Sequence, residues 1–261
     1  MLVVLLPAYN EASALPPLLP KIASALDGVE EDSTVLLVDD GSTDGTADVA
    51  RATADEHGLA IEIVSHGTNR GLGCALRTGF ARAAELAGPD GYVVAMDTDD
   101  THDPGLIPLM VDRIDDGYDV VIASRYAPGG REVGLSGTRR FLSRGASLLL
   151  TLFSPVRGAR DYTCGYRAYS GTILGRARSV WGEDFISEEG FVASAEILLK
   201  LGRLGARVAE VPLILRYDLK GGASKMRVGR TIGRYLRLVT VGRRALSSRR
   251  GATGAHGAAG R

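Results

Sequence analysis

Cysteine is scarce in this sequence. Its two cysteines, Cys74 and Cys164, stand far apart, and neither belongs to a C-x-x-C pair or lies near a histidine cluster. This pattern gives no indication of a disulfide framework or a zinc site. A reducing compartment fits such a chain best, and we expect a cytoplasmic location.

Long hydrophobic runs are also missing. The N-terminus is apolar for about six residues before Pro7, with no basic segment and no small-residue cleavage site, so it predicts a strand and not a signal peptide. No stretch reaches the roughly 18 uninterrupted apolar residues of a membrane span. We therefore expect any membrane contact to be peripheral, on the inner face of the membrane.

The formal net charge is zero, but the charges are unevenly distributed. Residues 200–261 contain about 15 Lys and Arg against two acids, Glu210 and Asp218. A basic segment of this kind indicates nucleic acid, anionic lipid or phosphate ligands, and the motifs upstream have to decide among them.

Apolar, β-branched runs alternate with longer helical patterns in the first part of the chain. Runs without polar alternation, such as residues 35–38, are typical of parallel strands covered by helices on both faces. The pattern predicts an α/β fold with a Rossmann-like, mostly parallel sheet flanked by helices. The predicted strands are 2–6, 34–38, 61–65, 92–96 and 119–123, and the predicted helices are 13–27, 43–57, 73–87 and 106–116.

The pattern changes after Tyr126, where a glycine-rich loop begins. We predict one domain over residues 1–246, with halves at 1–126 and 127–246. The second half is expected to contain amphipathic, basic helices, and the tail 247–261 is expected to be disordered. Its predicted elements are helices 139–153, 188–204 and 228–246 and a strand at 208–216.

Carboxylates follow the fourth predicted strand, which ends in Asp97, Thr98, Asp99 and Asp100. The carboxyl ends of strands are where open α/β sheets bind ligands. Two carboxylates one residue apart suit Mg²⁺, which keeps its other positions for water and phosphate oxygens and stabilises a leaving diphosphate. The alternative is a solvated acidic turn before the next helix.

Polar side chains also follow the first two predicted strands, among them Asn10, Glu11, Asp40, Ser42 and Asp44. Parallel strands end at one edge of a sheet, so we expect these side chains to share an edge with the carboxylates of the fourth strand. Capping of the next helix would account for some of them, but it does not account for both acids, Glu11 and Asp40.

The glycine-rich loop 69–79 is not a dinucleotide fingerprint, because Leu76 stands where G-x-G-x-x-G requires glycine. Two interpretations remain open. The loop is either a helix N-terminus whose amides meet a nucleotide or a plain tight turn.

Taken in order, six motifs resemble family-2 glycosyltransferases, in particular the polyprenol-phosphate (dolichol-phosphate) mannosyltransferase branch. The resemblance covers about residues 2–240. It implies a GT-A fold, inverting transfer of the sugar and a Mg²⁺ or Mn²⁺ cofactor. The motifs are P-A-Y-N-E, V-D-D-G-S-T-D-G-T, N-R-G-L-G-C-A-L-R-T-G-F, M-D-T-D-D-T-H-D-P, S-R-Y and G-A-S-K-M.

The resemblance implies a nucleotide-sugar site and a metal site. The metal ligands would be Asp97 and Asp99, with Thr101 at a position where the branch often has glutamine. His102 is expected near the metal but not as a ligand. The donor-binding residues would be Pro7, Ala8, Tyr9, Glu11, Asp40, Asp97, Thr98, Lys220 and Lys225.

Arginines follow the fifth predicted strand. We interpret Arg125 as a phosphate contact that takes part in catalysis, since guanidinium forks suit phosphate oxygens; a surface ion pair is the alternative. The stretch 161–167 is similar to a segment on the acceptor side of the cleft in relatives, and Cys164 within it is expected to be a small buried residue. The predicted acceptor-binding residues are Arg139, Arg140, Arg144 and Thr163.

The sequence has no clear general base for a hydroxyl acceptor. Glu188 and Glu189 lie in a segment resembling a variable stretch of the family, and the Q-x-x-R-W signature of processive relatives is missing. Because a phosphate acceptor is already anionic, this favours a polyprenyl phosphate. The basic, apolar segments 139–153 and 228–246 suit contact with an anionic membrane, although core packing of one face explains their apolar residues equally well.

The leading hypothesis is therefore metal-dependent transfer of a hexose, mannose first, from a nucleoside diphosphate sugar to a polyprenyl phosphate, with no nucleic-acid partner. One alternative is a glycosyltransferase acting on a soluble hydroxyl acceptor, with Glu188 or Glu189 as base. Another is a non-catalytic membrane module that binds the nucleotide. The sequence leaves the donor base and the sugar open.

Overall fold

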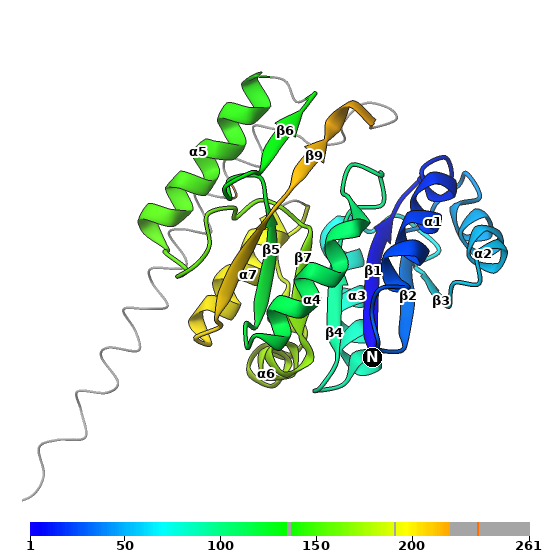
Figure 1. Ribbon diagram of the computed structural model, residues 1–261, viewed down its shortest axis with the longest axis horizontal. Coiled ribbons are helices and arrows are strands. Elements are labelled where there is room, and N and C mark those ends of the chain that lie inside the picture. The colour runs from blue at the N-terminus through cyan, green and yellow to red at the C-terminus, as the bar shows by residue number, and fades with distance from the viewer. Residues whose placement is uncertain (135–136, 191, 220–233, 235–261) are drawn as a thin grey trace, which may run out of the picture.

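The computed structural model describes residues 1–134, 137–190, 192–219 and 234 (Figure 1). The strands are β1 (Leu2–Ala8), β2 (Ser33–Asp39), β3 (Ile61–Ser65), β4 (Tyr92–Ala95), β5 (Val120–Ser124), β6 (Arg131–Val133), β7 (Arg167–Ser170), β8 (Val208–Pro212) and β9 (Ile214–Arg216). The helices are α1 (Leu15–Leu26), α2 (Thr46–Glu56), α3 (Leu72–Ala87), α4 (Ile107–Asp115), α5 (Gly137–Phe153), α6 (Gly171–Trp181) and α7 (Val192–Arg203), with short 3₁₀ turns η1 (Pro104–Leu106), η2 (Gly182–Phe185) and η3 (Tyr217–Leu219).

The main sheet has seven strands in the order β3-β2-β1-β4-β7-β5-β8 across the described residues. Its neighbours are parallel except at β7, which pairs antiparallel with both β4 and β5. The parallel strands therefore end at one edge, and because β7 runs the other way, the loop that precedes it reaches the same edge. A second, two-stranded parallel sheet joins β6 and β9.

Two layers of helices cover the sheet (Figure 1). Helices α1, α2 and α4 pack on one face, and α3, α6 and α7 pack on the other. Residues 2–6 of β1 are fully buried, as expected for a central strand with helices on both sides. Burial of each large apolar side chain stabilises the fold by about 1.5–3 kcal/mol, so the central strands hold the loops at the carboxyl edge of the sheet in place.

Local sequence signals explain several element boundaries. Helix α1 has proline in its first turn, where a missing N–H costs nothing, and α6 begins after Ser170, whose Oγ accepts a hydrogen bond from the amide of Ile173 (3.2 Å). Gly41 has a φ of +74°, and a Cβ there would lie 2.3 Å from the backbone carbon of Thr68. Only glycine permits this close approach of the loops after β2 and β3.

The predicted α/β class with a mostly parallel sheet is confirmed. The first five predicted strands and four predicted helices are present with small shifts at their ends. The sequence analysis missed β6, β7 and α6, and the predicted strand 208–216 is two strands, since the chain leaves the main sheet after β8 and continues into the small sheet as β9. β7 was missed because it has only four residues and includes an arginine, Arg167, which is fully buried.

Some predictions lie outside the described residues. These are the helix 228–246, apart from Arg234, and the tail 247–261. Strands from both predicted halves, 1–126 and 127–246, pair in one sheet. In the described part of the chain, no helix has both the length and the hydropathy that crossing a bilayer requires.

Candidate active site

The loops after β1 and β2 are joined by hydrogen bonds from backbone amides to side chains. The amide of Asn10 donates to Ser42 Oγ (2.9 Å), and Asn10 Oδ1 accepts from the amide of Thr43 (2.9 Å). Asp44 accepts from the amide of Ala12 (3.0 Å) and from Thr46. Burial alone would raise the pKa of Asp44, but these hydrogen bonds outweigh it and hold the pKa below its ordinary value.

Asp40, just after the end of β2, is buried, and three groups contact its carboxylate. Its carboxylate lies 2.7 Å from His66 Nδ1 and accepts from the amides of Arg70 (3.0 Å) and Gly71 (2.7 Å). The other ring nitrogen of His66 lies 2.9 Å from Thr78 Oγ1. Asp40 therefore shapes the loop that leads into α3, and His66, which the sequence analysis did not single out, is its partner.

The D-x-D segment follows β4 and lies at the same edge. Asp97 has a half-exposed side chain, and its amide donates to Nδ1 of the buried His102 (3.2 Å), whose Nε2 lies 4.0 Å from Asp97 Oδ2. The imidazole of His102 stacks on the ring of Tyr166 at 5.1 Å between centroids. His102 therefore lies beside this segment, and its ring nitrogen holds the backbone amide of Asp97. Its expected position near a metal stays a prediction.

The two threonines of this segment make internal hydrogen bonds. Thr98 Oγ1 donates to the carbonyl of Pro7 (2.9 Å), which ties the end of β4 to the end of β1. Thr101 is buried, and its Oγ1 donates to Asp99 Oδ1 (2.6 Å). In this arrangement Thr101 orients the carboxylate of Asp99.

The donor set of this segment fits a divalent cation completed by substrate. No group of three or more His, Cys, Asp or Glu side chains in the described chain is arranged to hold a metal ion. Asp97 and Asp99 provide two carboxylates from one turn, and Mg²⁺ is commonly held by one or two carboxylates together with waters and phosphate oxygens. The residues present therefore fit an ion that binds together with a diphosphate.

Arg125 follows β5 and forms a buried ion pair with Asp161. Its Nε donates to Asp161 Oδ2 (2.7 Å), and its Nη2 donates to Asp161 Oδ1 (2.6 Å) and to Thr163 Oγ1 (2.6 Å). Glu132 Oε1 lies 3.4 Å from Nη1. The guanidinium is thus engaged inside the protein, so the predicted phosphate contact would require it to exchange partners; the ion-pair alternative fits the observed geometry, although the pair is buried and not on the surface.

Helix α5 brings further arginines to the Arg125 cluster, which we define as Arg125, Asp161, Thr163, Glu132 and Tyr126. Arg140 Nε lies 3.2 Å from Glu132 Oε2, and the Arg144 guanidinium lies 5.9 Å from the ring centroid of Tyr126. Ser143 shares a hydrogen bond with Thr163 Oγ1 (2.9 Å). The side chain of Arg139 and the residues Lys220 and Lys225 lie outside the described residues.

Cys164 is buried, as predicted. Burial raises the pKa of its thiol to about 12, and the nearby charge of Asp161 adds to the effect. A thiol with such a pKa is not a nucleophile at neutral pH.

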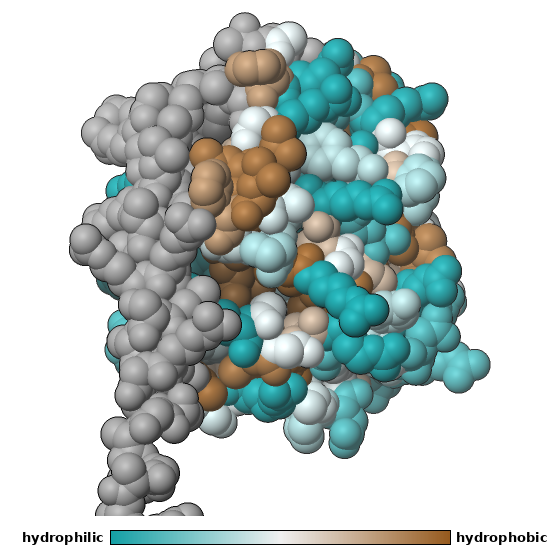
Figure 2. Space-filling model, turned by 90° about the vertical axis from the view of Figure 1, so that its left-hand side faces the viewer, coloured by the Kyte–Doolittle hydropathy of each residue, from teal (hydrophilic) through white to brown (hydrophobic). Residues whose placement is uncertain are grey.

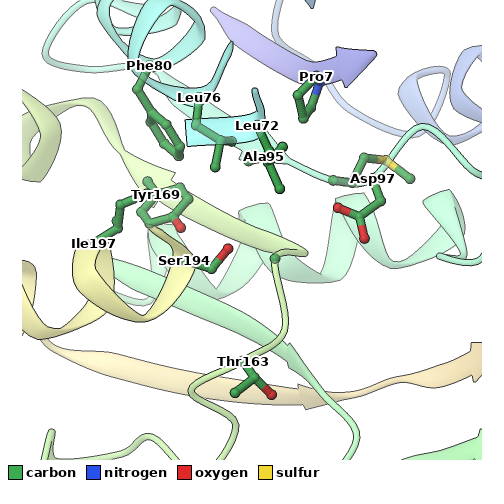
Figure 3. A pocket seen from close by; sticks show the side chains of 12 residues that line it. Pro7, Leu72, Leu76, Phe80, Ala95, Asp97, Thr163, Tyr169, Ser194 and Ile197 are labelled. Carbon is green, nitrogen blue, oxygen red and sulfur yellow. The ribbon is translucent and has the colours of Figure 1, made fainter. Parts of the chain in front are cut away.

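A cavity of about 40 Å³ lies between Asp97 and the Arg125 cluster (Figure 3). Pro7 and Asp97 border it from the ends of β1 and β4, Thr163 borders it from the Arg125 cluster, and Ser194 of α7 points its hydroxyl into it. The remaining lining is largely apolar and comprises Leu72, Leu76, Phe80, Ala95, Met96, Gly165, Tyr169 and Ile197.

Sequence reasoning missed His66, Glu132, Ser143, Asp161 and Ser194 as parts of the site. Asp161 stands at the head of the stretch 161–167 that the sequence analysis had placed on the acceptor side, so one signal for it existed. Nothing local marks the others, because their partners are distant in sequence.

An α/β sheet that presents a D-x-D segment beside interlocked loops at its carboxyl edge is a candidate transferase site. Residues 3–177 match the family described as glycosyl transferase family 2, which is more than half of the chain. The chain belongs to this family, and the protein is a glycosyltransferase. The resemblance indicated by the six motifs is thereby confirmed.

Two curated relatives match most of the chain. The undecaprenyl-phosphate mannosyltransferase of Micrococcus luteus is 34% identical over 227 residues, which cover 86% of this chain and 87% of that protein. The polyprenol monophosphomannose synthase of Mycolicibacterium smegmatis is 32% identical over 229 residues, which cover 85% of this chain and 80% of that protein.

A solved structure supports the fold. The crystal structure of glucosyl-3-phosphoglycerate synthase from Mycobacterium tuberculosis, in complex with Mn²⁺, UDP-glucose and phosphoglyceric acid, superposes with a TM-score of 0.60. The two proteins are 22% identical, and the match covers 93% of this chain and 78% of that chain. At this identity the likeness shows the fold alone, which is GT-A.

Proposed function

We propose that this enzyme transfers a hexose, mannose first, from a nucleoside diphosphate sugar to a polyprenyl phosphate with inversion at the anomeric carbon. The observation that carries the proposal is the cavity bordered by the D-x-D carboxylate Asp97 on one side and by Thr163 of the Arg125 cluster on the other. Both relatives described above are named for polyprenyl phosphate mannose synthesis, which supports this choice of acceptor and sugar.

On the donor side, the nucleotide would lie over the loops after β1 and β2. Tyr9 and Glu11 are half-buried at this edge, next to Pro7 and Ala8. Asp40 would act through the loop that it holds, because its carboxylate already accepts the amides of Arg70 and Gly71. Thr98 would hold Pro7 in position through its hydrogen bond to the carbonyl of Pro7. Lys220 and Lys225 remain proposed diphosphate contacts.

Asp97 and Asp99 would hold Mg²⁺ or Mn²⁺, and Thr101 would orient Asp99 or take a coordination position itself. When bound, such an ion stabilises the negative charge that develops on the leaving diphosphate. The solved relative from M. tuberculosis is crystallised with Mn²⁺ and, in another complex, with Mg²⁺ and UDP. These complexes support a divalent ion, Mg²⁺ or Mn²⁺, as the proposed cofactor.

On the acceptor side, charge balance favours Arg144 as the cation available to a phosphate. Arg125 is paired with Asp161 and Arg140 with Glu132, so these charges are neutralised inside the cluster. Arg144 is exposed and lies over Tyr126, and no carboxylate in the described chain pairs with it. Arg140 lies one helical turn before Arg144 on α5. Arg139 remains a proposed contact, and Thr163 would complete the acceptor site.

The chemistry then needs no general base. An oxygen of the acceptor phosphate is already anionic and forms the new bond to the anomeric carbon, while the bond from that carbon to the diphosphate oxygen breaks and its electron pair leaves with the nucleotide. One displacement of this kind inverts the anomeric centre. Arg125 would position Thr163 and the acceptor loop during the step.

Peripheral contact with an anionic membrane would bring the enzyme to its lipid acceptor, on the cytoplasmic side. Apolar side chains gather on the face that α5 presents (Figure 2). Leu150 of α5 packs in the core, but other apolar residues of the helix point to solvent, which core packing does not explain. These are Phe141, Leu148 and Leu152.

A hydroxyl acceptor has less support in the structure. Glu189 is exposed but pairs with Arg234 (2.7 Å), and the amide of Glu188 is held by Glu196 (2.7 Å). Neither glutamate borders the cavity next to Asp97.

The test is a transfer assay with purified protein and labelled GDP-mannose, UDP-glucose or UDP-GlcNAc, with and without polyprenyl phosphate and Mn²⁺. We expect a mannosyl lipid that forms only when GDP-mannose, polyprenyl phosphate and metal are all present. A product that forms only with a soluble hydroxyl acceptor would overturn the proposed acceptor. Metal-dependent nucleotide binding without any turnover would indicate a binding module.

A further inference from the structure

The cavity beside Asp97 contains a hydroxyl that the fold itself does not use. A serine within a helix commonly hydrogen-bonds to the carbonyl four residues earlier, as Ser179 does in α6 with Gly175 (3.0 Å). Ser194 of α7 makes no such bond, and in the described part of the chain its Oγ has no hydrogen-bond partner. It points into the cavity from the side opposite Pro7 (Figure 3).

Gly165 leaves the space in front of this hydroxyl open. A Cβ placed on Gly165 would lie 3.5 Å from Asp97 Oδ1 and 3.6 Å from Ser194 Oγ. The absent side chain of Gly165 therefore marks the point between the carboxylate of Asp97 and the hydroxyl of Ser194. Any larger residue there would fill part of the cavity.

The lining of the cavity fits the hydroxyl-bearing part of a sugar. A volume of about 40 Å³ is more than a single water molecule needs, so a polar substituent of a ligand can enter. Leu76 and Phe80 provide an apolar wall and Ser194 provides one hydrogen-bonding group, a combination typical of specific small-molecule sites.

The position of the cavity indicates the donor's sugar and not the lipid. Under the proposed function, the anomeric carbon lies between the leaving diphosphate, which Asp97 faces, and the acceptor phosphate near Thr163. Both residues border this cavity. The sugar ring is the part of the substrates that has to lie between them.

We propose that this cavity takes a hydroxyl-bearing substituent of the donor's sugar ring, and that Ser194 Oγ hydrogen-bonds to that hydroxyl. Ser194 and Gly165 are then specificity-determining residues: Ser194 provides the contact, and Gly165 provides the room. The inference rests on the proposed function for its donor class, a nucleoside diphosphate hexose.

The experiment compares binding of GDP-mannose and GDP, each with Mn²⁺, by isothermal titration. Ser194→Ala is expected to bind GDP-mannose about 3- to 10-fold more weakly than the wild type, the usual effect of one neutral hydrogen bond, and to bind GDP equally well. The added methyl group of Gly165→Ala keeps ordinary contact distances, so this variant is expected to fold. Because that methyl group occupies the cavity, we expect its affinity for GDP-mannose to fall about tenfold or more and its affinity for GDP to stay unchanged. Ser179→Ala is the matched control and should change neither.

Deoxy donors identify the hydroxyl. Among the 2-, 3-, 4- and 6-deoxy forms of GDP-mannose, one should bind wild type and Ser194→Ala equally well, since the partner of Ser194 is already missing. Equal weakening of GDP and GDP-mannose in Ser194→Ala would assign Ser194 a structural role and overturn the proposal. The proposal would also be overturned if Ser194→Ala bound GDP-mannose as tightly as the wild type does. It would be overturned as well if the variant lost the same factor in affinity for every deoxy donor.

The two proposals fail in different ways. If the wild type binds UDP-glucose or UDP-GlcNAc in place of GDP-mannose, the same comparison is made with that donor and UDP. Donor binding without transfer to polyprenyl phosphate would overturn the proposed acceptor and leave the result for Ser194 standing. A wild type that binds none of these donors would overturn both.

Discussion

Arg125 and Asp161 are two buried charges that depend on each other. Burial alone would lower the pKa of Arg125 and raise the pKa of Asp161, but their mutual attraction reverses both shifts and keeps the pair charged. Asp161 also accepts the amides of Thr163 (3.2 Å) and Cys164 (3.1 Å), so the pair shapes the loop before β7. Removal of one partner leaves the other charge buried without compensation.

We expect Asp161→Asn to lower the free energy of unfolding at pH 7 by about 3–5 kcal/mol, the usual cost of breaking a buried pair. Because the folded-state pKa of Asp161 lies below its ordinary value of 3.8, the stabilisation is complete above about pH 4 and is lost as the pH falls through the folded value. Urea unfolding between pH 7 and pH 3 measures both effects.

The control for this variant is Asp116→Asn, which removes an exposed pair with Arg113 and is expected to cost about 0–1 kcal/mol. A loss below about 1 kcal/mol for Asp161→Asn at pH 7 would contradict the prediction. A difference from the wild type that persists unchanged at the lowest pH would contradict its assignment to the charge of Asp161.

Two elements decide what the second part of the chain contributes to the site. The antiparallel direction of β7 carries its preceding loop, with Asp161 and Thr163, to the edge where β1 and β4 end. Helix α5 lies over this loop through Ser143 and exposes an apolar face, of which Leu148 and Leu152 are 61% and 68% exposed. Under the proposed function, the same helix would connect the acceptor side of the site with a surface suited to lipid.

We expect the double variant Leu148→Ser/Leu152→Ser to bind vesicles of phosphatidylglycerol and phosphatidylcholine at least about tenfold more weakly than the wild type. Burial of a leucine side chain contributes about 1.5–3 kcal/mol when complete, and two are removed. Co-sedimentation with vesicles measures the partition. The control is Val180→Ser, which removes another exposed apolar side chain, on α6. Equal binding by the double variant and the wild type would contradict a lipid-facing role of α5.

At the scale of the whole molecule, donor binding and stability are linked. The proposed metal and nucleotide would bind loops that extend from the neighbouring strands β2, β1 and β4, so they would stabilise the folded chain and not the unfolded one. A ligand present at about 100 times its dissociation constant adds about 2.7 kcal/mol, and in a protein of this size each kcal/mol shifts Tm by about 2–4 °C.

We expect Mn²⁺ and GDP together to raise the Tm of the wild type by about 5–10 °C, and Asp99→Asn to lose most of this rise and most of the activity. The Tm of the variant without ligand should stay close to that of the wild type, since asparagine can still accept from Thr101. Differential scanning fluorimetry measures the shifts.

The neighbouring Asp100→Asn is the control for this change. Asp100 pairs with Lys21 (2.6 Å) and has a φ of +57°, which asparagine also tolerates. It should retain the ligand-induced rise. An undiminished rise in Asp99→Asn would remove Asp99 from the metal site.

Local pattern was sufficient for the α/β class, for the first five strands and for the gathering of Asp97, Asp99 and Glu11 at one edge. Buried parallel strands are continuous apolar runs, and parallel strands end together, so both follow from short stretches of sequence. The expected small buried Cys164 followed from its surroundings in the same way.

Pairings between distant residues were beyond the sequence. His66 meets Asp40 across 26 positions and Arg125 meets Asp161 across 36, and no local signal announces either contact. The insertion of β7 between β4 and β5 is likewise a tertiary event, because its four residues have no periodicity of their own. The sequence by itself determined which chemical groups reach the edge of the sheet. Only the tertiary structure decided which of them form buried ion pairs and which, like Ser194, line the cavity. Burial and pairing depend on neighbours that the chain brings together only on folding.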